Sequence, residues 1–113
     1  MTVKMKQNHL FRMVYSRGKC FASPNLITYV VPRRSGGLQI GITTGKKIGN
    51  AVTRNRARRV IRAAWRACEK QLLPDCSAFI VFVARSRTAP AKSTDVAATM
   101  LQHLKDAELV GAQ

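Results

Sequence analysis

The sequence predicts an α+β fold in which helices pack on a single mixed sheet. Three features support this interpretation: a short amphipathic segment near the N-terminus, several strand-like segments within residues 21–44, and a long helical segment followed by an apolar run. Together they predict a four-stranded sheet and three helices in the order α-β-β-β-α-β-α. A chain of 113 residues can bury one modest core, so we predict one domain over residues 1–113.

The first helix is predicted over His9–Arg17 (HLFRMVYSR), and Gly18 follows as its end. Four apolar residues lie on one face of it, at i, i+1, i+4 and i+5: Leu10, Phe11, Val14 and Tyr15. Core packing explains this face, but Phe11 and Tyr15 lie one turn apart and could also form stacking platforms for unpaired bases. The pattern leaves both interpretations open. The polar and basic segment Met1–Asn8 is expected to be frayed, or ordered only on binding.

Two or three strands are predicted before the long helix. The segment Phe21–Pro24 is a candidate edge strand, and Leu26–Val31 (LITYVV) is a stronger strand that ends at Pro32. In Leu38–Thr44, apolar residues alternate with polar ones, which predicts a half-buried strand that forms a hairpin with the strand just upstream. Gly41 places no side chain on the second face of this strand, so another backbone could approach it closely.

A long basic helix is predicted over Ala51–Leu73, with Asn50 as its N-cap and Pro74 as its stop. At about 100° per residue, its apolar residues fall within an arc of roughly 140°. These residues form the expected buried face: Ala57, Val60, Ile61, Ala64, Trp65, Cys68 and Leu72. Most of the remaining circumference is basic and is expected to face outward: Arg54, Asn55, Arg56, Arg58, Arg59, Arg62, Arg66 and Lys70.

The charge is distributed very unevenly along the chain. The formal net charge is +15, from twenty basic and five acidic residues. Fifteen basic residues and no acid precede Glu69, so the five remaining basic residues balance the five acids and the net charge lies in the first 68 residues. Six arginines between Arg54 and Arg66, with no acid among them, repel one another, which favours a polyanionic partner over a merely solvated face. Arginine suits phosphate and base recognition, so nucleic acid is the leading candidate.

The apolar run Ser77–Ala84 (SAFIVFVA) predicts a central strand that is buried on both faces. A last helix, capped by Ser93 or Thr94, has an ordinary amphipathic pattern and is expected to cover the sheet. Strands Leu38–Thr44 and Ser77–Ala84 could run parallel, with the basic helix as their crossover. General rules predict a right-handed connection there.

Several function classes find no support in the sequence. No apolar run approaches the roughly 18 residues of a membrane-spanning helix, and the N-terminus lacks the apolar region of a signal peptide, so a cytoplasmic protein without a membrane partner is expected. Cys20, Cys68 and Cys76 include no C-x-x-C pair, which favours reduced structural thiols over a metal site. Neither the acids nor the two histidines form a constellation for phosphodiester hydrolysis, so no catalytic residue is predicted.

The stretch Lys46–Arg62 (KKIGNAVTRNRARRVIR) closely resembles the signature of the bacterial ribonuclease P protein component, a small basic subunit that works with a catalytic RNA in maturing the 5′ end of transfer RNA precursors. The spacing of Phe11 and Tyr15, the strand order and the chain length are also similar to that family, so the resemblance covers nearly the whole chain. It implies a fold similar to a domain of small-subunit ribosomal proteins, with a left-handed βαβ crossover. We adopt this expectation in place of the right-handed one.

The resemblance also implies a function. The chain would be the noncatalytic subunit of an endoribonuclease, its partners would be the catalytic RNA and precursor tRNA, and Mg²⁺ would be held mainly by RNA, with no small-molecule substrate. A cleft between sheet and helix, with Phe11 and Tyr15 at its edge, would hold the single-stranded 5′ leader. The expected RNA-binding residues are Lys46, Lys47, Asn50, Arg54, Asn55, Arg56, Arg58, Arg59, Arg62 and Arg66. A general or ribosomal-type RNA-binding protein, and less favourably a protein-only ribonuclease, remain as alternatives.

Overall fold

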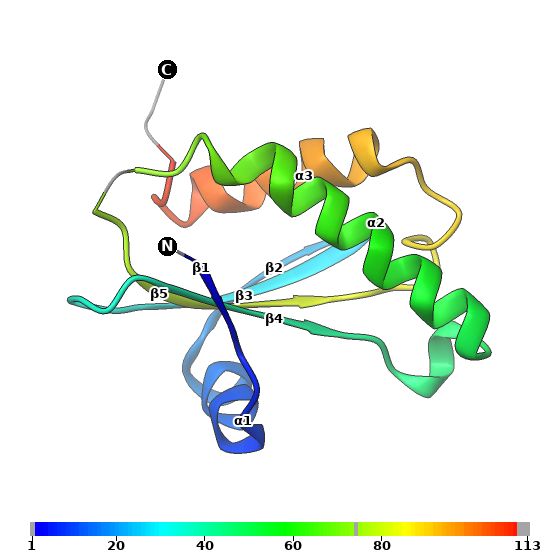
Figure 1. Cartoon of the computed structure of the whole chain (residues 1–113), viewed down its shortest axis with the longest axis horizontal. Coiled ribbons are helices and arrows are strands. Elements are labelled where there is room, and N and C mark those ends of the chain that lie inside the picture. The colour runs from blue at the N-terminus through cyan, green and yellow to red at the C-terminus, as the bar shows by residue number, and fades with distance from the viewer. Residues whose placement is uncertain (1, 74, 111–113) are drawn as a thin grey trace.

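The computed structural model describes residues 2–73 and 75–110, and Figure 1 shows a sheet with helices on both of its faces. All three predicted helices and all four predicted strands are present, and the structure adds a short N-terminal strand and a 3-10 turn. The elements in chain order are β1 (Thr2–Lys4), α1 (Asn8–Arg17), β2 (Lys19–Ser23), β3 (Leu26–Pro32), β4 (Leu38–Thr43), η1 (Lys46–Ile48), α2 (Ala51–Glu69), β5 (Ala78–Val83) and α3 (Ser93–Asp106).

The sheet is mixed, with the strand order β1-β4-β5-β3-β2. Strands β4 and β5 are parallel, as predicted, whereas β3 runs antiparallel to both β5 and β2. The predicted hairpin between β3 and β4 is wrong, because β5 lies between them. The backbone of β5 needs hydrogen-bonding partners along both of its edges, and β3 and β4 supply them. The connection from β3 to β4 therefore passes the start of β5, where Arg33 N–H donates to Ser77 O over 2.9 Å.

The expectation of a frayed N-terminus is wrong for the residues that the structure describes. Strand β1 pairs in parallel with the outer edge of β4, so that Lys4 lies opposite Ile40. Immediately after β1, Met5 N–H donates to Ile40 O over 2.7 Å, and the Met5 side chain is buried with Val14 and Val81. The open edge of β4 and an apolar site beneath it thus order this segment without a ligand.

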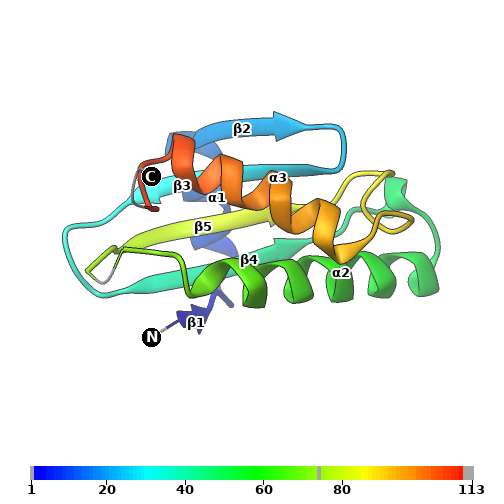
Figure 2. The ribbon, with the colours of Figure 1, turned by 90° about the horizontal axis from the view of Figure 1, so that it is seen from above.

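The crossover from β4 through α2 to β5 is left-handed. Figure 2 shows the sheet from the side of α2 and α3, with β4 and β5 both running from left to right. If this view is turned so that both strands point up the page, β5 lies to the left of β4 and α2 lies in front of the sheet. A connection that passes in front of the sheet and leads to a strand on the left is left-handed. This confirms the expectation drawn from the resemblance and departs from the general rule.

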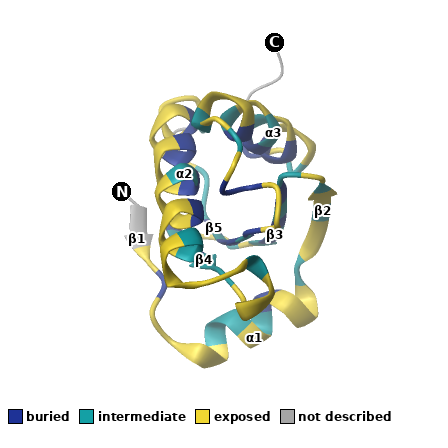
Figure 3. Cartoon of the chain, turned by 90° about the vertical axis from the view of Figure 1, so that its right-hand side faces the viewer, coloured by how far each residue is buried: buried dark blue, intermediate teal, exposed yellow. Residues whose placement is uncertain are grey.

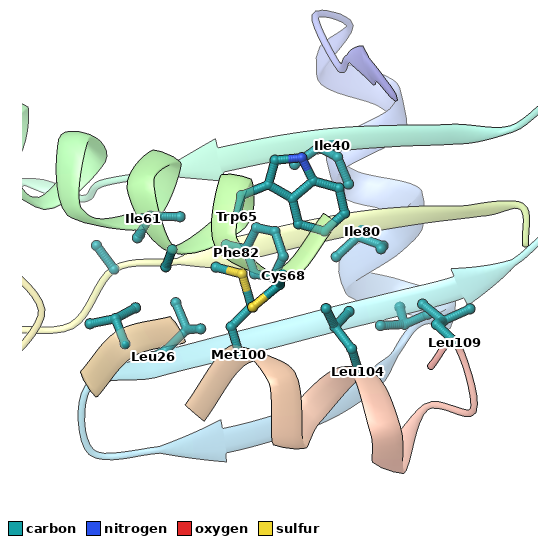
Figure 4. Packing of buried hydrophobic residues seen from close by; sticks show 14 of the residues in the cluster. Leu26, Ile40, Ile61, Trp65, Cys68, Ile80, Phe82, Met100, Leu104 and Leu109 are labelled. Atoms are coloured by element: carbon teal, nitrogen blue, oxygen red, sulfur yellow. The ribbon is translucent and has the colours of Figure 1, made fainter. Parts of the chain in front are cut away.

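Strand β5 is buried on both faces, as predicted, and joins two apolar clusters. The larger cluster lies under α2 and α3, where the rings of Trp65 and Phe82 are 5.8 Å apart (Figure 4). The smaller one lies under α1 around Val14 and Val81, both fully buried. Helix α3 covers the sheet through Val96, Met100 and Leu104, all fully buried, which confirms its predicted role.

Three helix boundaries differ from those predicted, and the smallest difference is that α1 begins at Asn8 rather than His9. Helix α2 ends at Glu69 rather than Leu73, because the chain turns to pair with the C-terminal segment: Leu73 N–H donates to Leu109 O over 2.9 Å. The predicted stop, Pro74, lies outside the described residues. The N-cap of α3 is Lys92, whose side chain makes no capping bond, and neither Ser93 nor Thr94 takes that position.

Candidate nucleic-acid interface

The start of α2 is fixed by a glycine-flanked loop and a side-chain cap. Gly49 has φ = 140°, a conformation that disfavours other residues, and it ends η1, on which Lys46 and Lys47 are exposed. Asn50 Oδ1 then accepts a hydrogen bond of 3.0 Å from Thr53 N–H, which confirms the predicted N-cap. The cap uses the side-chain oxygen of Asn50, so part of this residue's role is structural.

Helix α2 has the two faces that its periodicity predicts. Five residues of the predicted apolar arc are buried: Ala57, Ile61, Ala64, Trp65 and Cys68. The polar residues expected to face outward are exposed, apart from half-buried Arg54, and we call them the outer ridge of the helix: Asn55, Arg56, Arg58, Arg59, Arg62 and Arg66. Figure 3 shows exposed residues on the outer side of α2 and buried residues on the side that faces the sheet. A ridge of five exposed arginines without an acid among them presents a strongly positive surface to solvent.

One flank of this ridge overlooks a cleft of about 440 Å³ that runs along the edge of β4 between α1 and α2. Its apolar lining comes from α1, β4, α2 and the residue that follows β1, and its charged lining comes from β1 and α2. The lining residues are Lys4, Met5, Phe11, Ile40, Ile42, Arg58, Arg62 and Trp65. No acidic side chain is among these lining residues. Apolar and aromatic groups beside cations are what a single nucleic-acid strand requires, because its bases stack while its phosphates need positive charge.

The Phe11 side chain packs in the smaller apolar cluster and also lines the cleft. Its ring lies against Gly41 so closely that a Cβ on Gly41 would be 2.5 Å from Phe11 Cε1. The close approach expected at Gly41 is therefore made by an aromatic side chain, and the expectation of a backbone there is wrong. Phe11 is half-buried, so it contributes to the smaller apolar cluster and to the cleft lining, and its use as a stacking platform stays a prediction.

Tyr15, one turn further along α1, lies beside the cleft rather than in its lining. Its side chain is 40% exposed, and its hydroxyl donates to Thr43 Oγ1 over 3.2 Å. The ring meets that of Tyr29 edge to face, with centroids 5.1 Å apart. A hydrogen bond with the side chain of Cys20, together with burial, raises the pKa of Tyr29. Tyr29 was not among the predicted site residues, because within a strand pattern it reads only as a β-former.

Five residues of the cleft lining were also missed by sequence reasoning. Ile40, Ile42 and Trp65 were recognised as apolar positions, but a periodic pattern does not show which apolar residues border an opening. Lys4 and Met5 belong to the N-terminal segment, whose strand was not predicted. The contact of β1 with β4 is nonlocal, and a three-residue strand has too short a pattern to be recognised.

His103 and the cysteines lie outside the cleft lining and the basic face of α2. His103 is buried, and its Nδ1 and Nε2 each lie 2.8 Å from a hydroxyl, Thr28 Oγ1 and Ser23 Oγ respectively. The three cysteines are free, and burial raises the pKa of the Cys68 thiol. Over residues 2–73 and 75–110, no group of three or more His, Cys, Asp or Glu side chains could hold a metal ion. None of the helices in those ranges is long and apolar enough to span a membrane.

Sequence comparison places residues 1–108 within the family described as Ribonuclease P. The ribonuclease P protein component of Shouchella clausii is 32% identical over 108 residues, which covers 95% of this chain and 87% of the relative. That of Clostridioides difficile is 38% identical over 96 residues, covering 84% and 82% respectively.

Solved structures agree with this relationship. The Staphylococcus aureus RNase P protein superposes with a TM-score of 0.78 at 25% identity, covering 96% of this chain and 97% of its own. The Thermotoga maritima RNase P protein superposes with a TM-score of 0.76 over 91% and 96% of the two chains, and at 20% identity it supports the fold alone.

Proposed function

Because the chain belongs to the ribonuclease P protein family, we propose that it binds the catalytic RNA of ribonuclease P and the 5′ leader of precursor tRNA. As the protein subunit of this endoribonuclease it would assist removal of the leader, giving the mature tRNA 5′ end. Hydrolysis by protein groups would need metal-binding carboxylates or a general acid and base pair, and the sequence predicts no such group of residues. We therefore assign the chemistry to the RNA subunit. The proposed site of action is the cytoplasm.

The cleft beside β4 is the observation that carries the leader-binding proposal. A single strand that entered it would meet Phe11 on one wall and Trp65 on the other, with Arg58 and Arg62 in the same lining. We therefore assign the leader's bases to the aromatic walls and its phosphates to these two arginines. Tyr15 would extend the stacking surface beyond the cleft.

The proposed contacts with the catalytic RNA lie on η1, at the N-terminus of α2 and on its outer ridge. These residues are Lys46, Lys47, Asn50, Arg54, Asn55, Arg56, Arg59 and Arg66, and they point to a phosphate backbone because arginine forks fit phosphate oxygens. Fixed cations replace part of the counterion atmosphere of RNA. The protein would thereby lower the magnesium concentration that the holoenzyme needs, while Mg²⁺ itself is held mainly by RNA.

Cleavage of a labelled tRNA precursor at low magnesium tests this function. The assay compares the cognate catalytic RNA alone, the protein alone, and both together, and it includes Arg58→Gln/Arg62→Gln beside a charge-matched control, Lys70→Gln/Lys105→Gln. We expect efficient cleavage only with both components, and a loss of stimulation of about tenfold or more in the cleft variant alone. Lys70 and Lys105 are exposed and lie outside the cleft lining, so the control removes the same charge elsewhere.

Other outcomes separate the alternatives. If the protein stimulates cleavage no more than an unrelated basic protein does, it is a general RNA-binding protein of ribosomal type. If the protein cleaves the precursor without the RNA subunit, catalysis belongs to this chain and the proposed division of labour is overturned.

A further inference from the structure

The outer edge of β4 is paired along only part of its length. Strand β1 ends at Lys4, which lies opposite Ile40, and the next residue closes the ladder with a bond of 2.7 Å from Met5 N–H to Ile40 O. Strand β4 itself continues to Thr43. Within residues 2–73 and 75–110, β1 is the only strand that pairs with this edge. The last part of β4 therefore keeps a free edge.

The backbone of Ile42 faces this free edge. Successive residues of a strand direct their N–H and C=O groups to opposite edges. Thr43 O accepts a bond of 2.9 Å from Ala84 N–H on the side of β5, whereas Ile40 O is bonded on the outer side. Ile42 lies two residues beyond Ile40, so both its N–H and its C=O point outward. Such open groups on an edge strand are a template for a hydrogen-bonding partner.

Ile42 also lies in the lining of the cleft, between two aromatic residues. The Phe11 ring occupies the place where a Cβ of Gly41 would project, which is on the α1 face of the sheet. Trp65 lines the cleft from α2, on the other face. A planar group that lies in the plane of the sheet, with its edge toward Ile42, would therefore have an aromatic ring on each side. A nucleobase has this shape, and its faces stack on aromatic rings.

An unpaired base supplies the groups that this edge lacks. Its Watson–Crick edge carries a hydrogen-bond donor beside an acceptor, and in a duplex these groups are already paired. Resting on the proposed function and deepening it, we propose that the N–H and C=O of Ile42 hydrogen-bond to the Watson–Crick edge of one leader base. This contact makes the cleft select an unpaired strand. The arginines of the lining do not make that distinction, because their charge attracts paired and unpaired RNA alike.

Methylation of the Watson–Crick edge tests the contact without removing the base. In precursor tRNA bound to the holoenzyme, each leader position in turn carries either uridine or N3-methyluridine, and either guanosine or N1-methylguanosine. Both methyl groups leave the base uncharged and keep its π-face for stacking. The dissociation constant of each precursor is measured with the wild-type protein and with two variants at residue 42.

The two variants differ in the backbone group that they leave at residue 42. Ile42→Pro removes the N–H, and proline is tolerated where the N–H of an edge strand faces outward. Ile42→Val keeps the N–H and is the matched control. Thermal denaturation checks that both variants fold. If Ile42→Pro does not fold, an ester in place of the Ile42 amide removes the same N–H without the proline ring.

At one leader position, methylation should weaken binding to the wild type and to Ile42→Val about tenfold, because it leaves backbone groups of the cleft without partners. Ile42→Pro should bind the unmodified precursor about tenfold more weakly than the wild type and should no longer distinguish the methylated one. The proposal is overturned if methylation has no effect on the wild type at any leader position, or if folded Ile42→Pro keeps the full effect of methylation. In those cases the proposed function stands as long as the wild type stimulates cleavage more than an unrelated basic protein does. A wild type without that stimulation overturns both.

Discussion

The ring of Phe11 on α1 lies directly against Gly41 on β4, so that a Cβ at residue 41 would be 2.5 Å from Cε1 and 2.6 Å from Cζ of the ring. The contact joins helix α1 to strand β4, which borders the cleft. It also fixes the position of Phe11, an aromatic side chain that belongs both to the smaller apolar cluster and to the cleft lining. The absence of a side chain at Gly41 thus determines where Phe11 can stand.

Gly41→Ala should therefore displace the Phe11 ring. We expect the free energy of unfolding to fall by about 1–3 kcal/mol, as for other overpacked sites, and leader affinity to fall with it. Urea denaturation and binding of a leader oligonucleotide measure the two effects. Gly45→Ala is the control for stability, because its Cβ would meet no atom within 4 Å and its φ of −72° suits alanine. Equal stability of the two variants would show that the ring moves aside without cost.

The sequence predicted the elements of this site better than their arrangement. The pattern of α2 was sufficient to assign Ala57, Ile61 and Trp65 to its buried face, because 3.6-residue periodicity is a local property. Strand pairing is nonlocal, and the short connection between β3 and β4 was read as a hairpin although β5 inserts between them. The N-terminal strand β1 was not predicted because its pairing is also nonlocal: it forms only by pairing with the outer edge of β4.

The cleft itself could be anticipated only through the resemblance. Phe11 was identified from its spacing with Tyr15, but the residues that complete the lining come from β1, β4 and α2, which no sequence pattern brings together. The free edge of β4 at Ile42 depends on where β1 ends, and a three-residue strand has too short a pattern for its end to be predicted.

Asn50 separates a structural role from a binding role. Because its Oδ1 caps α2 through Thr53 N–H, Asn50→Ala should lower the free energy of unfolding by about 1 kcal/mol. Asn50→Ser keeps a capping oxygen and should retain most of that stability. We expect Asn50→Ser to weaken binding of the catalytic RNA, measured by filter binding, because it removes the amide group assigned to that contact. Full RNA affinity in a stable Asn50→Ser protein would instead limit Asn50 to its capping role.

The stability of the fold should depend on the protonation of His103. Burial lowers the pKa of His103, and the carboxylate of Asp106 opposes this in part. The unfolded chain therefore binds a proton near the ordinary histidine pKa of 6.5 while the folded protein does not. The free energy of unfolding should fall as the pH is lowered through 6.5, and the fall should end below the folded-state pKa, where both states are protonated.

Urea denaturation of the wild type and of His103→Gln between pH 7.5 and pH 5 would measure this dependence. The substitution removes the titrating group, so its stability should change less over that range. His9→Gln is the control, since His9 is exposed on α1. If the pH dependence of the free energy of unfolding is retained in His103→Gln and lost in His9→Gln, it arises from His9 and the prediction is contradicted.

Phe11→Leu should separate packing from stacking in the cleft. Leucine is an apolar replacement of similar reach, so the smaller cluster should lose no more than about 1.5 kcal/mol of stability. A leucine offers no π-face to a base, and the loss of one stacking contact should weaken binding of a single-stranded leader by about 1–3 kcal/mol. Tyr15→Phe, which removes only the hydroxyl bonded to Thr43, should keep its ring and thus most of the leader affinity. Titration of a labelled leader oligonucleotide gives both affinities. If Phe11→Leu binds the leader as tightly as the wild type while precursor cleavage is unaffected, the ring serves the core alone, and the bases of the leader must rest against Trp65 or outside the cleft.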